Sequence, residues 1–399
     1  MRSIPRRRLC GALCALAAGA LCTSAALAQE VVKVGVIGPL SGPFSAAFGI
    51  PFRQGVETYA AQVGGKAGNV KVEFVWRDLE GPNPERAKAL AQELVVKEKV
   101  QYLGGFVFTP NALAVAPLVQ GAKIPTVIFN ASTSVVVSKS DYFLRTSNTL
   151  PQVTVPVARY ALEKGLKRVV TAVSEYGPGL DAENAFKATF EAGGGQVIEV
   201  IRMPVQATDF GPFMQKVRSL KPDALFGFLP FGPPTFGFVK AFADNGLKAD
   251  GIKLLGTAET QESDLQALGD AALKVETGYY YSAAHESPEN KAFLAALAKT
   301  HPGAVANPAT VAAYDGARLI FRMIEATGGK ADPDKALAAV KGFKFESPRG
   351  PVEIDAKTRD IVQNVYMRSV EKGAGGKLVN KEFKTYAAQP DHGPQLTKK

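Results

Sequence analysis

The feature that constrains this chain most is an alternation of apolar runs with helical stretches, repeated along most of its length. Val31 to Ile37 and Tyr102 to Phe108 are typical of buried strands, and Arg168 to Val173 and Ala224 to Phe228 repeat the pattern. A helical stretch follows each of them. Strands that alternate with helices form parallel sheets covered on both faces. Two such sets, each longer than about 100 residues, predict an α/β protein with two lobes.

The first 28 residues have the three parts of an export signal. Arg2 to Arg8 form a positive start, Leu9 to Leu21 an apolar stretch, and Ala26-Leu27-Ala28 a small-x-small cleavage site before Gln29. The apolar stretch is shorter than the roughly 20 residues that span a membrane, and no second such stretch follows. We therefore expect cleavage after Ala28 and export of the mature chain.

Removal of this segment would change the cysteine content and the net charge of the mature chain. All three cysteines lie within it, so the mature chain is expected to have no disulfide and no thiolate chemistry. The large Leu21 before Cys22 argues against lipid attachment. Cleavage also removes four arginines and no acid, which leaves 43 Lys and Arg against 37 Asp and Glu, a net charge of +6. These basic residues form no long run, so no nucleic-acid partner is expected.

The sequence carries no pattern typical of catalysis or of a bound metal. His285, His301 and His392 share no metal-ligand spacing, and neither a G-x-S-x-G nor an H-E-x-x-H motif occurs. The glycines of the loop 35–42 lack the G-x-G-x-x-G spacing of a nucleotide-binding loop. We expect no enzyme activity, no cofactor and no metal, with a secreted hydrolase as the weaker alternative.

Hydroxyl side chains follow two neighbouring predicted strands. Thr109-Pro110 opens a helix, with Thr suited to the N-cap and Pro to the first helical position. Free N–H groups at such a helix start attract anions, including a ligand carboxylate, and plain helix capping is the alternative. Ser132 and Thr133 follow the next strand. Open α/β sheets bind ligands beyond the carboxyl ends of their strands, where these hydroxyls would converge.

Aromatic residues gather in the same loops. Phe44, Phe48 and Phe108 lie in the first half of the chain, and Tyr176 and Phe231 in the second. A ring in a loop is harder to assign to the core than a ring in a periodic stripe. Each is a candidate ligand contact, with a place in the core as the alternative.

Three segments, together with the export signal, resemble the periplasmic solute-binding proteins of ABC transporters, of the branched-chain amino-acid-binding (leucine/isoleucine/valine-binding) type. They are Val-Gly-Val-Ile-Gly-Pro-Leu-Ser-Gly-Pro at 34–43, Tyr-Gly-Pro-Gly at 176–179 and Tyr-Asp-Gly-Ala at 314–317. The resemblance covers Val31 to about Tyr386. It implies the type I periplasmic binding protein fold, with two Rossmann-like lobes joined by three hinge crossings.

The resemblance also implies a division of the chain. The expected crossings lie near 145–149, 279–283 and 347–350. The expected parts are lobe I at 29–146 and 281–350, lobe II at 147–280 and 351–386, and a flexible tail at 387–399.

Roles for several residues come from the family pattern. Hydroxyls of the first lobe hold the ligand carboxylate in this family, which implies Thr109 and Thr133, with Ser132 beside them. Phe48 stands where an aromatic residue of the first lobe packs on the ligand. Tyr176 and Phe231 match aromatic positions of the second lobe.

Two departures from the pattern bear on the ligand. Phe108 stands beside Thr109 where many members have two hydroxyl residues. Glu259, the acidic candidate for a ligand ammonium, is displaced by about one position. Phenylalanines favour an apolar or aromatic ligand body. A branched-chain or other hydrophobic amino acid and an aromatic acid both remain open.

The sequence thus predicts an exported, monomeric solute-binding protein of the periplasm. It would capture a small hydrophobic carboxylate between two lobes by hinge closure and present it to the membrane permease of an ABC transporter. A ligand-sensing receptor of the same fold is the alternative.

Overall fold

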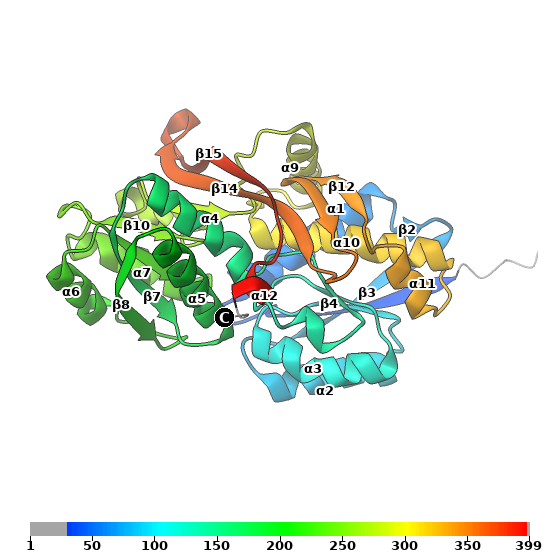
Figure 1. Ribbon diagram of the computed structural model, residues 1–399. Helices are drawn as coiled ribbons and strands as arrows, with labels where there is room; N and C mark the ends of the chain where they lie inside the picture. Colours follow the sequence, from blue (N-terminus) through cyan, green and yellow to red (C-terminus); the bar gives the residue numbers. More distant parts are fainter. Residues whose placement is uncertain (1–29, 397–399) are drawn as a thin grey trace, which may run out of the picture.

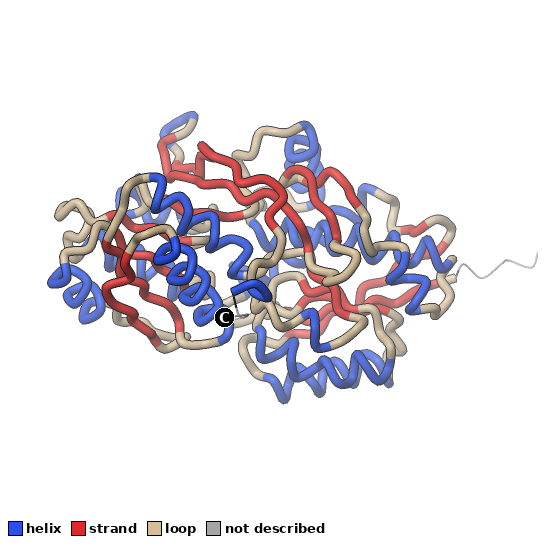
Figure 2. The backbone as a smooth tube through the Cα atoms, in the orientation of Figure 1, coloured by secondary structure: helices blue, strands red, loops and turns tan. Residues whose placement is uncertain are grey.

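The computed structural model describes residues 30–396, so the predicted export signal at 1–28 lies outside the described residues. The described chain forms two lobes, each built around one sheet with helices packed on its faces (Figures 1 and 2). The two-lobed α/β architecture predicted from the strand–helix alternation is confirmed.

The first sheet has six strands in the order β2-β3-β1-β4-β5-β6. They are β1 (Val31–Gly38), β2 (Lys66–Ala67), β3 (Val70–Asp78), β4 (Tyr102–Gly105), β5 (Thr126–Ile128) and β6 (Phe143–Arg145). All neighbours pair in parallel except β2, which is antiparallel to β3. The central strand β1 is rich in valine and almost wholly buried, as a strand covered on both faces requires.

The second sheet has nine strands, eight of them in the order β12-β13-β14-β11-β10-β9-β7-β8, with β15 paired to β14. They are β7 (Arg168–Ser174), β8 (Gln196–Met203), β9 (Ala224–Phe228), β10 (Lys253–Gly256), β11 (Glu276–Tyr279), β12 (Lys344–Ser347), β13 (Gly350–Ile354), β14 (Ile361–Lys372) and β15 (Leu378–Gln389). Strands β7 to β11 pair in parallel, whereas β12 to β15 pair antiparallel. This sheet is therefore mixed, because short connections join its last four strands.

Helices cover both sheets and begin, in most cases, just beyond a strand end. They are α1 (Ile50–Gln62), α2 (Pro84–Val96), α3 (Thr109–Ala122), α4 (Leu150–Glu163), α5 (Gly177–Ala192), α6 (Gly211–Leu220), α7 (Pro233–Asp244), α8 (Leu265–Leu268), α9 (Pro288–Thr300), α10 (Pro308–Thr327), α11 (Pro333–Ala338) and α12 (Gly393–Leu396). A π-helical turn, η1 (Ser45–Gly49), precedes α1. Helix α10 packs along α1, so the chain returns to the first lobe after β11 (Figure 1).

The segments that pass between the lobes are bonded to one another. The buried Arg349 donates through Nη1 to the carbonyl of Thr146 at 2.8 Å and to Oε1 of Gln363 at 2.9 Å. Tyr279 donates from its hydroxyl to Oδ1 of Asn148 at 3.0 Å. A change of angle between the lobes must therefore occur within a buried, hydrogen-bonded bundle of chain segments.

Two boundaries differ from those expected from the sequence. Strand β12 pairs with β13, so the second sheet includes residues from Lys344 onward. The sequence had assigned residues 281–350 to lobe I. The expected flexible tail at 387–399 is wrong for residues 387–396, because β15 continues to Gln389 and α12 packs against α5. Asp391 accepts hydrogen bonds from two side chains there, and this anchoring has no local sequence signal.

Candidate functional site

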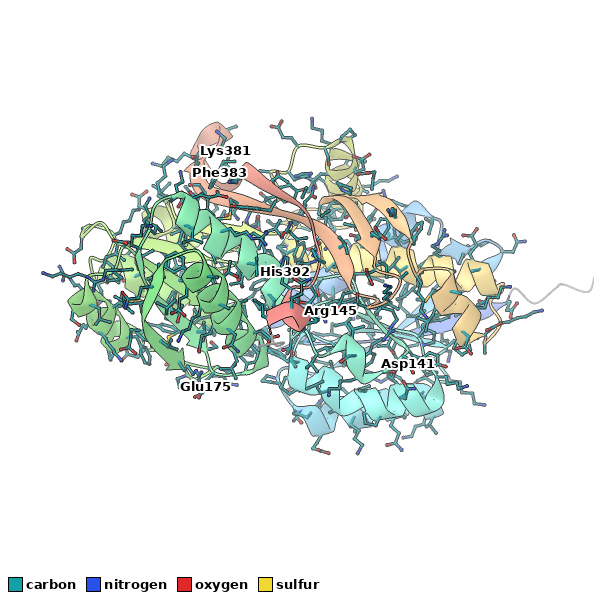
Figure 3. All side chains as sticks on the ribbon, viewed as in Figure 1. Asp141, Arg145, Glu175, Lys381, Phe383 and His392 are labelled. Carbon is teal, nitrogen blue, oxygen red and sulfur yellow. The ribbon has the colours of Figure 1, made fainter. Side chains whose placement is uncertain are left out.

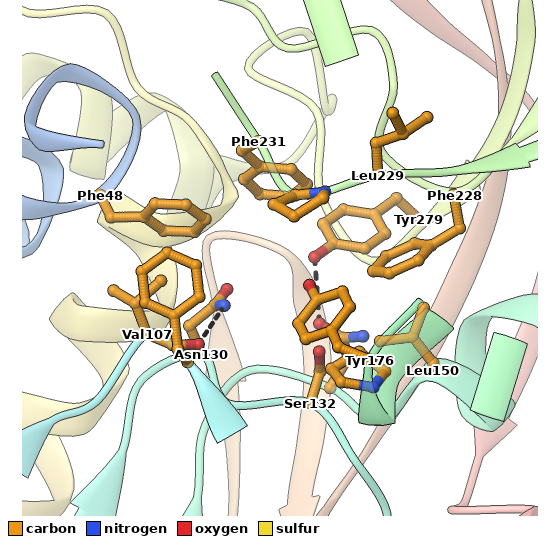
Figure 4. A pocket seen from close by; sticks show the side chains of 14 residues that line it. Phe48, Val107, Asn130, Ser132, Leu150, Tyr176, Phe228, Leu229, Phe231 and Tyr279 are labelled. Atoms are coloured by element: carbon orange, nitrogen blue, oxygen red, sulfur yellow. Dashed lines mark hydrogen bonds between the residues drawn. The ribbon is translucent and has the colours of Figure 1, made fainter. Parts of the chain in front are cut away.

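A cavity lies between the two lobes at the carboxyl ends of their strands, where open α/β sheets bind ligands (Figure 4). It is lined by Phe48, Val107, Phe108, Asn130, Ser132, Asn148, Leu150, Tyr176, Pro178, Phe228, Leu229, Pro230, Phe231 and Tyr279. The side chains of the two lobes leave room between them for about one water molecule. The lobes are therefore closed on each other, and a larger ligand enters only when they open.

Aromatic rings from both lobes line this cavity, and one pair of them joins the lobes. Phe48 of the first lobe stacks on Phe231 of the second, with centroids 5.1 Å apart and planes 3° apart. Phe108 lies edge-on to Phe48, and Phe231 edge-on to Tyr279. Figure 4 shows the Phe48 and Phe231 rings facing each other at one side of the cavity. The closed form thus presents aromatic faces and edges to whatever lies between the lobes.

The two threonines predicted to hold a carboxylate lie together at the edge of the cavity. Their hydroxyl oxygens are 2.8 Å apart, and both residues are buried. Gly177 at the start of α5 covers them, since a Cβ placed on it would lie 2.8 Å from Thr133 Oγ1 and 3.7 Å from Thr109 Cγ2. Thr109 and Thr133 are therefore brought together as expected, but they do not line the cavity in the closed form.

The predicted N-cap role of Thr109 is wrong. Helix α3 begins at Thr109 itself, its N-cap is Phe108, and no side chain caps it. The Thr109 hydroxyl bonds Thr133 instead, across two neighbouring strand ends. Helix α5 of the second lobe also begins without a side-chain cap, directly opposite. Two helix N-termini thus meet at the cavity, and each favours negative charge.

The polar groups of the lining are neutral. Asn130 donates to the carbonyl of Val107 at 3.0 Å, and Asn148 accepts from Tyr279. Burial, together with the nearby charge of Glu259, raises the pKa of Tyr176, so its phenol keeps its proton. None of the fourteen lining residues carries a charge.

Glu259 lies close to the cavity but is turned away from it. It is fully buried, and both carboxyl oxygens accept from backbone N–H groups: Oε1 from Leu229 at 3.3 Å, and Oε2 from Thr257 at 2.5 Å and Ala258 at 2.9 Å. Burial raises its pKa to about 7. In this geometry the carboxylate ties its own loop to the end of β9, and the contact with a ligand ammonium stays a prediction.

Five of the eight predicted site residues line the cavity: Phe48, Phe108, Ser132, Tyr176 and Phe231. Thr109 and Thr133 lie behind it, and Glu259 is bonded to backbone. Sequence reasoning missed Asn148, Phe228 and Tyr279 among the lining residues. Phe228 and Tyr279 are the last residues of β9 and β11, so the sequence pattern assigns them to the hydrophobic core. Asn148 lies in a segment that crosses between the lobes, and its position depends on how the lobes pack together.

A family model described as periplasmic binding protein matches residues 31–377. The chain belongs to this family. Within residues 30–396 of this periplasmic binding protein, no helix is long and apolar enough to cross a membrane. Over the same range, no group of three or more His, Cys, Asp or Glu side chains is placed to hold a metal ion.

Relatives and solved structures agree with this assignment. The chain is 53% identical over 388 residues to Leu/Ile/Val-binding protein homolog 6 of Brucella abortus (strain 2308), covering 96% of this chain and 98% of the relative. It is 56% identical, with a TM-score of 0.89, to a solute binding protein of an ABC transporter from Rhodopseudomonas palustris HaA2 in complex with p-hydroxybenzoic acid, covering 93% of this chain and all of that one.

A third similarity is to a solute binding protein of an ABC transporter from Rhodopseudomonas palustris BisB5 in complex with 3,4-dihydroxybenzoic acid. It has 43% identity and a TM-score of 0.87, and covers 91% of this chain and 99% of that one. This periplasmic binding protein is the solute-binding component of an ABC transporter.

Proposed function

We propose that this periplasmic binding protein captures a hydroxylated aromatic carboxylate, of the hydroxybenzoate class, between its lobes and delivers it to an ABC permease. The observation that carries the proposal is the lining of the cavity: six aromatic residues and no charged side chain. The two Rhodopseudomonas palustris proteins that are 56% and 43% identical to this chain hold hydroxylated benzoic acids.

A flat ring suits the shape and chemistry of the cleft. A benzoate ring that enters the cleft would find Phe48 and Phe108 on one lobe and Phe231 and Tyr279 on the other. Each aromatic contact adds about 0.5–1.5 kcal/mol beyond the burial of apolar area. The ring would therefore replace the ring–ring contacts that now join the lobes directly.

The carboxylate has a matching site at the two helix N-termini. The start of α5 lies against the Thr109 and Thr133 hydroxyls, and Ser132 lines the cavity beside them. Opening of the lobes separates Gly177 from this hydroxyl pair and exposes it. A ring hydroxyl has neutral partners in Asn130, Asn148 and Tyr279.

A branched-chain amino acid is the second candidate, favoured by the name of the 53% identical Brucella abortus protein. Its ammonium would need an acidic partner, because a buried charge without a partner is strongly unfavourable. Glu259 has both oxygens bonded to backbone and lines no part of the cavity. This geometry favours a ligand without an ammonium group.

The proposal also covers the oligomeric state, the processing and the partners of the protein. We infer a monomer without catalytic activity, processed to begin at Gln29 in the periplasm, with no nucleic-acid partner. Hinge closure around the ligand would present one closed surface to the permease. A ligand-sensing receptor and a secreted hydrolase are the alternatives, and neither is favoured by a feature of the cleft.

A thermal unfolding screen of the mature protein with matched ligands tests the proposal. 4-Hydroxybenzoate against 4-hydroxybenzyl alcohol isolates the carboxylate, and leucine against 4-methylpentanoate isolates the ammonium. A ligand present at about 100 times its Kd stabilises the folded state by about 2.7 kcal/mol. We expect 4-hydroxybenzoate to raise the Tm and the alcohol and leucine to have little effect. Stabilisation by leucine alone would refute the aromatic-acid assignment.

A further inference from the structure

The C-terminal end of the described chain, residues 390–396, lies across the junction of the two lobes, and we call it the C-terminal clamp. Figure 1 shows α12 between α5 of the second lobe and the loops of the first, and Figure 3 labels His392 and Arg145 at this junction. Helix α12 packs against α5, and His392 is buried. The clamp follows β15, so its position is set by a strand of the second sheet.

Asp391 of the clamp binds groups on both sides of the hinge. Its Oδ1 accepts from Ser134 Oγ at 2.9 Å and from Thr149 Oγ1 at 2.7 Å. Ser134 follows Thr133 in the first lobe, and Thr149 is the N-cap of α4, where the first crossing ends. The same oxygen accepts from Gly393 N at 2.9 Å, which fixes the turn of the clamp itself.

A second carboxylate reaches the same serine from the opposite lobe. Asp181 on α5 accepts from Ser134 N through Oδ2 at 2.9 Å. The loop before Ser134 is held on its other side by Arg145, whose Nη1 donates to the carbonyls of Ala131 at 2.7 Å and Thr133 at 3.0 Å. The loop that carries Ser132 and Thr133 is thus fixed from behind by groups that do not touch the cavity.

We propose that Asp391 and Asp181 are positioning residues for ligand capture: through Ser134 they hold the Ser132–Thr133 loop against the second lobe and stabilise the closed form. The bond from Asp181 joins the lobes directly and must break when they separate. The bonds from Asp391 tie the same loop to the start of α4. The C-terminal clamp therefore contributes to affinity without touching the ligand.

Close packing at Gly393 supports the same assignment independently of charge. A Cβ on Gly393 would collide with Ser134 Oγ, so the clamp approaches this loop as closely as backbone allows. The outer residues Pro394 and Gln395 are exposed. Gly393 thus brings the clamp into close contact with Ser134, and we expect a larger residue at position 393 to displace the loop.

Two kinds of variant test the clamp. Asp391→Ala removes the acceptor, whereas Asp391→Asn keeps an oxygen for Ser134 and Thr149. Asp270→Ala, which removes an exposed aspartate of the second lobe just after α8, is the matched control. We expect Asp391→Ala to raise the Kd for 4-hydroxybenzoate roughly tenfold, mostly through faster dissociation, since bonds to a charged group are lost. Asp391→Asn should recover most of the affinity, and Asp270→Ala should bind as the parent does.

A distance measurement tests the clamp without any ligand. The mature chain has no cysteine, so Lys88→Cys on α2 and Lys187→Cys on α5 place one spin label on each lobe at exposed positions. Asp391→Ala should shift the ligand-free distance distribution away from the closed separation, and Asp391→Asn should not. The affinity arm rests on the proposed function, whereas the distance arm stands even if 4-hydroxybenzoate does not bind.

The proposal is overturned if Asp391→Ala leaves the distance distribution unchanged. A chain ending at Gln389, which lacks the clamp entirely, provides a second variant should Asp391→Ala fold poorly. An unchanged distribution in that chain would equally assign the contacts to static packing.

Discussion

Phe48 and Phe231 belong to different lobes, and their rings stack with centroids 5.1 Å apart and planes 3° apart. The two lobes therefore touch through two aromatic residues that line the cavity. Opening separates them, and a flat ligand can restore contact with both rings. This relationship makes the Phe48–Phe231 pair the first place to test how the ligand is held.

Phe231→Ala should weaken binding of 4-hydroxybenzoate by about 2–3 kcal/mol, from lost apolar area and lost ring contact. Phe231→Leu keeps most of the apolar area and should cost about 1 kcal/mol. Calorimetric titration measures both. Phe383→Ala, a half-exposed ring on β15, is the control. Equal affinities for the alanine and parent proteins would place the ligand elsewhere.

Thr133→Val removes one of the two hydroxyls at the edge of the cavity. It should weaken binding by about 1.5–3 kcal/mol, the usual range for a hydrogen bond to a charged group. It should also lower the free energy of unfolding by about 1–3 kcal/mol, because the buried Thr109 hydroxyl loses its partner.

A second threonine pair offers the matched control for this variant. Thr58 and Thr300 have hydroxyls 2.9 Å apart on α1 and α9, away from the cleft. Thr58→Val should lower stability in the same manner while leaving the Kd unchanged. If both valine variants affect stability alone, Thr133 has only a structural role.

Glu259 gives the protein a pH-dependent stability. Its folded pKa of about 7 lies above the ordinary value of 4.5, so the folded state holds a proton that the unfolded state has lost between these pH values. The free energy of unfolding should therefore fall as pH rises from about 4.5 to 7, by about 3 kcal/mol from this group. Denaturant unfolding at pH 5 and pH 8 measures the change.

Glu259→Gln should remove that part of the pH dependence. The difference between variant and parent isolates Glu259 from Asp360, whose pKa burial raises to about 6. The same variant should leave the affinity for an aromatic acid nearly unchanged. A large loss of affinity for leucine in this variant would indicate instead that the carboxylate turns toward a ligand ammonium.

Maturation provides a prediction that does not depend on the cleft. The intact mass of the exported protein should correspond to a chain that begins at Gln29 and carries no lipid, since Leu21 precedes Cys22. A mass that includes Cys22 with acyl chains would contradict cleavage after Ala28.

The fold was predictable from local signals, and the closed cleft only in part. Runs such as Val31–Gly38 followed by helical stretches identify parallel strands because the pattern lies within one segment. Hydroxyl residues that follow β4 and β5 could be placed at one edge of the sheet, because neighbouring parallel strands end at the same edge. The contact of Gly177 with Thr133 depends on the angle between the two lobes, and this angle cannot be predicted from the pattern of any single segment.

Two carboxylates show why the hydrogen-bond partners of a side chain are hard to predict from the sequence. The polar segment after Gln389 has the composition of a mobile tail. In the structure, however, Asp391 accepts hydrogen bonds from Ser134 and Thr149, which lie more than 200 residues earlier in the chain. Glu259 has the position of an ammonium partner, but backbone N–H groups of its own and a neighbouring loop take both oxygens. Asp391 is held by long-range hydrogen bonds, whereas Glu259 accepts two bonds from its own loop and one from the more distant Leu229.

The most direct measurement is a calorimetric titration of the mature protein, freed of any retained ligand by unfolding and refolding, with 4-hydroxybenzoate and with leucine. We expect saturable binding of 4-hydroxybenzoate with a negative heat-capacity change, as burial of an aromatic ring between the lobes requires, and no measurable heat with leucine. Saturable binding of leucine together with no binding of 4-hydroxybenzoate would contradict it.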